Sequence, residues 1–141
     1  MVIRFEFLEH TADTKIRAYG SSLEEAFCSV AVATSAVMCD VDKLNSDNSF
    51  SVSVKSNNVK ALLYDFLEEL LFLFDTEGFI VKEVRDIKII RGEELSLSCF
   101  VFGCFVSEGF DISTSIKAVT YSEMEIVEGV DLVMIQVVLD L

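Results

Sequence analysis

Proline and tryptophan are absent from this sequence of 141 residues, and histidine occurs only once. Proline-rich or glycine/serine-rich stretches usually mark the linkers between folding units, and the sequence contains neither these nor a repeat or low-complexity tract. Its length also falls in the range of one ordinary domain. We therefore expect residues 1–141 to form a single domain.

Basic residues are scarce. Eleven lysines and arginines stand against 24 aspartates and glutamates, which gives a formal net charge of −13. Such a chain repels a phosphate backbone unless a local basic patch outweighs the overall field. The composition therefore predicts no direct binding to nucleic acid.

Long apolar runs are also missing, although 52% of the residues are hydrophobic. No run approaches the roughly 18 residues of a membrane-spanning helix, and charges alternate with apolar residues from Arg4 to Glu6, so we expect no signal peptide. The four cysteines, Cys28, Cys39, Cys99 and Cys104, match neither a disulfide scaffold nor the spacing of a zinc site. We expect a soluble, cytoplasmic protein with free thiols and no membrane contact.

The hydrophobic pattern predicts strands and two helices. Strands are expected at 2–8, 14–20 and 49–55, the last from its period-two alternation. One helix is expected from Ser21 or Ser22 to about Cys39, and another from Asn57 or Asn58 to about Thr76, ended by Gly78. Further strands are expected at 79–91, 94–106, 114–119, 122–128 and 131–139, with tight turns at Gly92 and Gly129. This order predicts an α+β fold, a two-layer sandwich with both helices on one face of a mostly antiparallel sheet.

The second predicted helix is apolar over much more of its surface than an ordinary surface helix. Either two of its sides are buried or part of it meets a partner. Large apolar helix faces are core more often than interface, so we favour burial.

No glycine-rich phosphate loop, G-x-S-x-G or H-E-x-x-H motif is present. Asp13 and Asp140, however, interrupt or end apolar strands, and Leu141 carries the terminal carboxylate. If the last strand pairs near the first ones, these oxygens meet, and a cluster of like charge is costly unless a hard cation such as Ca²⁺ or Mg²⁺ joins it. The alternative is that both aspartates end turns and face solvent.

Three other groups have two interpretations each. His10 is either a general acid or base or a structural residue at a strand end. Asp40 and Asp42 either belong to a solvated loop or bind a metal ion. Lys117 is either an exposed strand lysine or a functional cation in a chain that has few.

Five segments resemble the archease family in order and spacing over essentially the whole chain. They are FEFLEHTAD at 5–13, IRAYG with LEEAF at 16–27, LFDTEG at 73–78, IKAVTY at 116–121 and the terminal Asp140. The resemblance implies a two-helix α+β sandwich. It also implies an accessory protein of the GTP-dependent RNA ligase of tRNA splicing and RNA repair, which joins 2′,3′-cyclic-phosphate ends to 5′-hydroxyl ends. Archeases promote guanylylation of this ligase and support its multiple turnover.

The resemblance also implies functional residues. The divalent cation site, with Ca²⁺ as the expected ion, carries over to Asp13, Asp140 and Leu141, and the functional lysine carries over to Lys117. His10 is expected to contact the partner or nucleotide. The family usually continues its lysine strand with histidine where this sequence has Ser122, and residues 107–114 lack the expected proline-containing segment.

Three functions follow as hypotheses. The first is a non-enzymatic activator of the RNA ligase. The second is a chaperone or modulator of an RNA-processing partner such as a tRNA methyltransferase, a role that the apolar second helix would serve. The third is a metal-dependent phosphohydrolase that uses His10 and Asp13.

Overall fold

The computed structural model describes residues 1–8, 13–107 and 109–141. Within these residues, seven strands and two α-helices follow one another, with a short 3₁₀ turn between the first helix and the third strand. Their bounds are β1 Arg4–Leu8, β2 Asp13–Gly20, α1 Leu23–Met38, η1 Val41–Lys43, β3 Asn48–Ser56, α2 Val59–Glu77, β4 Phe79–Arg91, β5 Leu95–Phe105, β6 Ala118–Glu128 and β7 Val133–Asp140.

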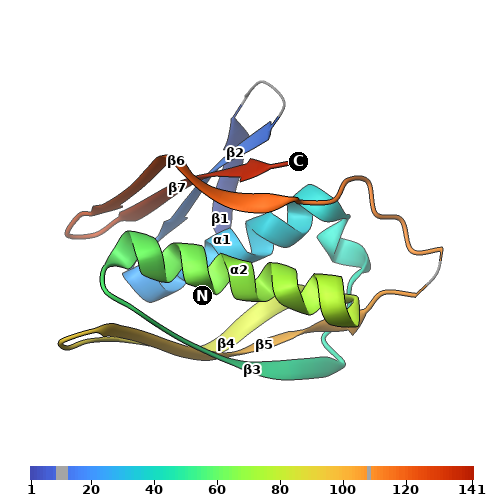
Figure 1. The fold of residues 1–141 in the computed structure, drawn as a ribbon, viewed down its shortest axis with the longest axis horizontal. Coiled ribbons are helices and arrows are strands. Elements are labelled where there is room, and N and C mark those ends of the chain that lie inside the picture. The colour runs from blue at the N-terminus through green and yellow to red at the C-terminus, as the bar shows by residue number, and fades with distance from the viewer. Residues whose placement is uncertain (9–12, 108) are drawn as a thin grey trace.

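The strands form two antiparallel sheets. A four-stranded sheet has the order β1-β2-β7-β6, and a three-stranded sheet has the order β3-β5-β4. Both helices contact both sheets, and Figure 1 shows them lying between the sheets. The expected α+β class with two helices on antiparallel strands is thus confirmed. The strands, however, divide into two sheets, so the helices form a middle layer between them.

The position of α2 between the sheets explains its composition. Its contacts run to β6 of one sheet and to β3, β4 and β5 of the other. Seven of its apolar side chains are buried, whereas Phe72 is 58% exposed. The interpretation of α2 as a helix buried on two sides is therefore confirmed. Its buried apolar residues are Leu62, Leu63, Phe66, Leu67, Leu70, Leu71 and Leu73.

Both helices begin at predicted caps. The Oγ of Ser22 accepts a hydrogen bond from the backbone N–H of Glu25, and Asn58 Oδ1 accepts one from the N–H of Ala61. These bonds satisfy amide groups that the first turn of a helix leaves without partners. At the end of α2, Gly78 has φ of 67°, a left-handed conformation that glycine adopts without the usual steric cost.

One expected break between strands is wrong. The segments 114–119 and 122–128 were expected as separate strands, but β6 runs continuously from Ala118 to Glu128, and 114–117 is not strand. The register of β6 on β7 shifts between Thr120 and Glu125, and Glu123 has φ of 53°. Extra residues bulge out of the ladder here, which interrupts the alternating pattern without ending the strand.

The four cysteines are buried and free, as expected. Of the helices in the described residues, none has the length and apolarity needed to cross a bilayer.

Candidate functional site

The pairing of β2 with β7 brings Asp13 and Asp140 together. The two residues are direct partners at one end of this antiparallel ladder. Side chains of directly opposed residues lie on the same face, with their Cβ atoms about 5 Å apart. Asp13 is half-buried and Asp140 is exposed, so a solute can reach the pair from solvent.

Two carboxylates in this position repel each other, because like charges directly opposite on a sheet are destabilising. A hard divalent cation removes that cost and takes carboxylate and main-chain carbonyl oxygens as ligands. No group of three histidine, cysteine or acidic side chains able to hold a metal ion occurs within the described residues. A cation at the two carboxylates would need a further donor, and the main-chain oxygens of the adjacent Leu141 are of the right chemical kind. Such a set of oxygen donors would suit Ca²⁺ or Mg²⁺.

Lys117 lies beside the same carboxylate pair. Its backbone N–H donates a hydrogen bond of 2.8 Å to the carbonyl oxygen of Asp140, and the next residue, Ala118, is the β6 partner of Asp140. The side chain of Lys117 is exposed. Three separate segments of the chain therefore converge, and Asp13, Lys117, Asp140 and Leu141 gather at one end of the four-stranded sheet.

A polar network covers the sheet next to the carboxylate pair. Lys15 Nζ donates to Glu123 Oε1 over 3.0 Å, and Arg17 Nε donates to Gln136 Oε1 over 2.9 Å. Gln136, which is only 5% exposed, also donates from Nε2 to the backbone oxygen of Glu123 over 2.7 Å. These bonds hold the β6 bulge against β2 and β7.

This network could not be found from the sequence pattern. The only sign of the network in the sequence is that Gln136, a polar residue, interrupts an apolar strand. The bulge also carries Ser122, and the ring of Tyr121 stacks on Tyr64 of α2 with centroids 4.5 Å apart.

Two other predicted sites are Asp40 with Asp42, which lie apart from the carboxylate pair, and His10. Asp40 is the N-cap of η1, where its Oδ1 accepts a hydrogen bond from the N–H of Asp42, and both side chains are exposed. The solvated-loop interpretation of these two aspartates therefore fits. His10 lies outside the described residues.

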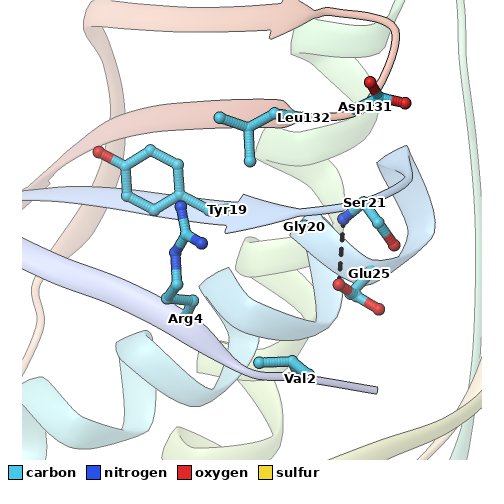
Figure 2. Close-up of a pocket in the computed structure, with 8 residues that line it drawn as sticks. All are labelled: Val2, Arg4, Tyr19, Gly20, Ser21, Glu25, Asp131 and Leu132. Carbon is cyan, nitrogen blue, oxygen red and sulfur yellow. Dashed lines mark hydrogen bonds between the residues drawn. The ribbon is translucent and has the colours of Figure 1, made fainter.

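A pocket of about 230 Å³ opens at the opposite end of β2, near Gly20 (Figure 2). Eight residues of strand separate it by roughly 23 Å from Asp13. Several of its polar groups already have partners: the N–H of Ser21 donates to Glu25 Oε1, and the guanidinium carbon of Arg4 lies 4.9 Å from the centroid of the Tyr19 ring. These contacts stabilise the start of α1 and the edge of the sheet, and the pocket is not part of the carboxylate site.

Comparison with known proteins gives the relatives of this chain. Residues 5–141 match the Archease protein family (MTH1598/TM1083). Protein archease of Methanosarcina barkeri is 37% identical over 98% of this chain and 96% of its own length. Protein archease of Thermococcus gammatolerans is 42% identical over 87% of each chain, and the archease-like protein of Drosophila melanogaster is 35% identical over 92% of this chain and 83% of its own.

Solved structures give the same result. The solution structure of protein 1598 of Methanobacterium thermoautotrophicum is similar with a TM-score of 0.84 and 37% identity, covering 97% of this chain and 98% of that one. A crystal structure from Thermotoga maritima, described as an archease and possible chaperone, shares the fold with a TM-score of 0.59 and 22% identity, covering 100% of this chain and 99% of that one. The resemblance of the five sequence segments is thus confirmed, and this protein is a member of the archease family.

Proposed function

We propose that this protein is a cytoplasmic, non-enzymatic activator of the GTP-dependent RNA ligase that joins 2′,3′-cyclic-phosphate and 5′-hydroxyl ends. In this proposal, Asp13, Asp140 and the main-chain oxygens of Leu141 hold a divalent cation, with Ca²⁺ as the first choice. The direct pairing of Asp13 with Asp140 is the observation that carries the cation site. The ligase itself is inferred from family membership.

The carboxylates form a site that a partner can approach. A bound divalent cation supplies positive charge that attracts nucleotide phosphates or acidic groups. Lys117 adds an exposed cation next to Asp140, because its backbone is tied to the Asp140 carbonyl. In this proposal, Lys117 contacts a nucleotide phosphate or an acidic group of the ligase, and His10 contacts the ligase or the nucleotide.

The net charge of −13 favours docking on a basic, RNA-binding enzyme. Complementary charges raise the rate of encounter and fix orientation more than they raise affinity. The rate of association with the ligase should therefore fall as ionic strength rises.

Guanylylation of the cognate ligase with labelled GTP tests the proposal, with the protein added at about one-tenth of the ligase concentration. We expect many labelled ligase molecules per molecule added, and no turnover when the protein meets GTP alone. Asp140→Asn and Lys117→Ala should each reduce the stimulation. Asp131→Asn, an exposed aspartate in the turn before β7, is the matched control and should retain it.

Failure of the wild-type protein to stimulate would contradict the ligase role. Full stimulation by Asp140→Asn would contradict the cation role alone, because the ligase role would still stand.

A chaperone for an RNA-processing enzyme such as a tRNA methyltransferase is the second candidate. The description of the Thermotoga maritima relative supports it, as do exposed apolar side chains such as Phe7 and Phe72. The second helix, which would have served this role, is buried on two sides. Protection of several unrelated clients from heat aggregation would favour the chaperone, whereas activity on the ligase alone would exclude it.

A further inference from the structure

The outer face of the three-stranded sheet carries two aromatic side chains on its central strand. Phe100 and Phe102 lie two residues apart on β5, so they point to the same side. The other residues on that side are serine or charged, apart from Ile90, whereas Leu97, Cys99 and Val101 of β5 face the core. The residues that share this outer face are Ser49, Ser51, Ser53 and Lys55 on β3, Ser96, Ser98, Phe100 and Phe102 on β5, and Glu83, Arg85, Lys88 and Ile90 on β4.

This face is open. The helices cover the other side of the sheet, and Figure 1 shows no element below it in that view. Phe100 is 46% exposed, and its partner on β3 is Ser51, whose small side chain leaves the ring accessible. The guanidinium carbon of Arg85 lies 3.9 Å from the centroid of the Phe102 ring. Phe100 is therefore the open ring, with a stacked cation next to it.

The charge of the face is opposite to that of the whole chain. Lys55, Arg85 and Lys88 stand against Glu83 and against the exposed Asp86 in the bulge between Arg85 and Lys88, so three cations oppose two carboxylates and the local charge is +1. Glu83 is paired with Arg85. Among the described residues, neither Lys55 nor Lys88 has an ion-pair partner. The global charge of −13 thus leaves a basic patch on this sheet.

We propose that the outer face of the β3-β5-β4 sheet binds single-stranded RNA, with a base stacked on Phe100 and the backbone phosphates near Lys55 and Lys88. Single-stranded nucleic acids bind to surfaces that combine exposed aromatic rings with cations, and RNA-binding sheets use aromatics on their central strands in this way. The serine hydroxyls on β3 and β5 can bond with ribose or phosphate oxygens. The inference is independent of the cation site and of the ligase.

An acidic peptide is the other partner that a positive face could attract. An extended peptide adds to the exposed edge of a sheet through main-chain hydrogen bonds, and its carboxylates make no use of an open aromatic ring. The ring lies on the central strand β5, with Lys55 on one edge strand and Lys88 on the other, so a ligand that reaches all three lies across the face and not along one edge. RNA therefore accounts for more of the observed residues.

Fluorescence anisotropy of a labelled ten-nucleotide oligoadenylate RNA tests the proposal at low salt. Base stacking is worth about 1–3 kcal/mol per base, so Phe100→Ala should weaken binding by about 5- to 150-fold. Replacing both Lys55 and Lys88 by alanine should also weaken it. With about two phosphate contacts, at Lys55 and Lys88, the wild-type affinity should fall by about 7-fold between about 50 and 200 mM salt.

Phe72→Ala and Lys60→Ala are the matched controls, since both side chains are exposed on α2 away from this face. They should bind as the wild type does, and all variants should keep the wild-type unfolding temperature. Absence of binding by the wild type, or equal binding by Phe100→Ala, would overturn the proposal. Displacement of the RNA by oligoglutamate at equal charge would overturn it in favour of an acidic protein partner.

Discussion

Two buried thiols give the clearest prediction for single residues. Burial raises the pKa of Cys28 to about 12 and that of Cys99 to about 11, above the ordinary value of 9.0. Because the thiolate is the reactive form, both cysteines should resist iodoacetamide in the folded protein at pH 8 and react after unfolding. Ser49→Cys places a thiol on an exposed strand position and serves as the reactive control. Rapid labelling of the folded wild type would show that these thiols are accessible.

The same shifts predict a loss of stability in alkali. Above about pH 9 the unfolded thiols ionise, whereas the folded ones stay protonated until about pH 11 to 12. The unfolded state then binds fewer protons, so the free energy of unfolding falls as pH rises through this window. Cys28→Ala should reduce the slope between pH 9 and 11 in urea titrations. An unchanged slope would contradict the assignment.

At the scale of elements, α2 combines a buried side with an exposed one. It lies between the two sheets, with Leu67 fully buried and Phe72 on its exposed side. Leu67→Ala should lower the free energy of unfolding by about 3 kcal/mol, since it removes transfer energy and leaves a cavity. Phe72→Ala should change it by less than about 0.5 kcal/mol. Chemical denaturation measures both, and equal losses would mean that α2 is not packed as described.

Local signals predicted most of these elements. Ser22, Asn58 and Gly78 mark helix ends through hydrogen bonds and backbone conformation that depend on a few neighbouring residues. The period-two pattern at 49–55 likewise corresponds to β3. Division into two sheets could not be predicted in this way, because alternation shows which side of a strand is buried but not which strand lies beside it.

The candidate site was predictable only in part. Asp13 and Asp140 are 127 positions apart, and the sequence could say only that they would meet if their strands paired. The register of β2 on β7 makes them direct partners. The bulge in β6 and its contacts through Gln136 depend on that register too, and no local signal marked them.

At the scale of the whole molecule, charge is the dominant feature. A net charge of −13 on 141 residues means that the folded chain repels itself, and dissolved salt screens this repulsion. The unfolding temperature should therefore rise as NaCl increases from about 10 to 300 mM, with scanning calorimetry as the measurement. A fall in the unfolding temperature would show that favourable ion pairs outweigh the repulsion.

Calcium binding tests the central claim, that Asp13 and Asp140 form a cation site where β2 pairs with β7. Calorimetric titration with CaCl₂ should be done at about 150 mM NaCl, where screening suppresses diffuse attraction to the acidic surface. We predict saturable binding to the wild type, loss of binding in Asp13→Asn and in Asp140→Asn, and retention in Asp131→Asn. Absence of binding to the wild type, or binding that survives both substitutions at the pair, would contradict the account.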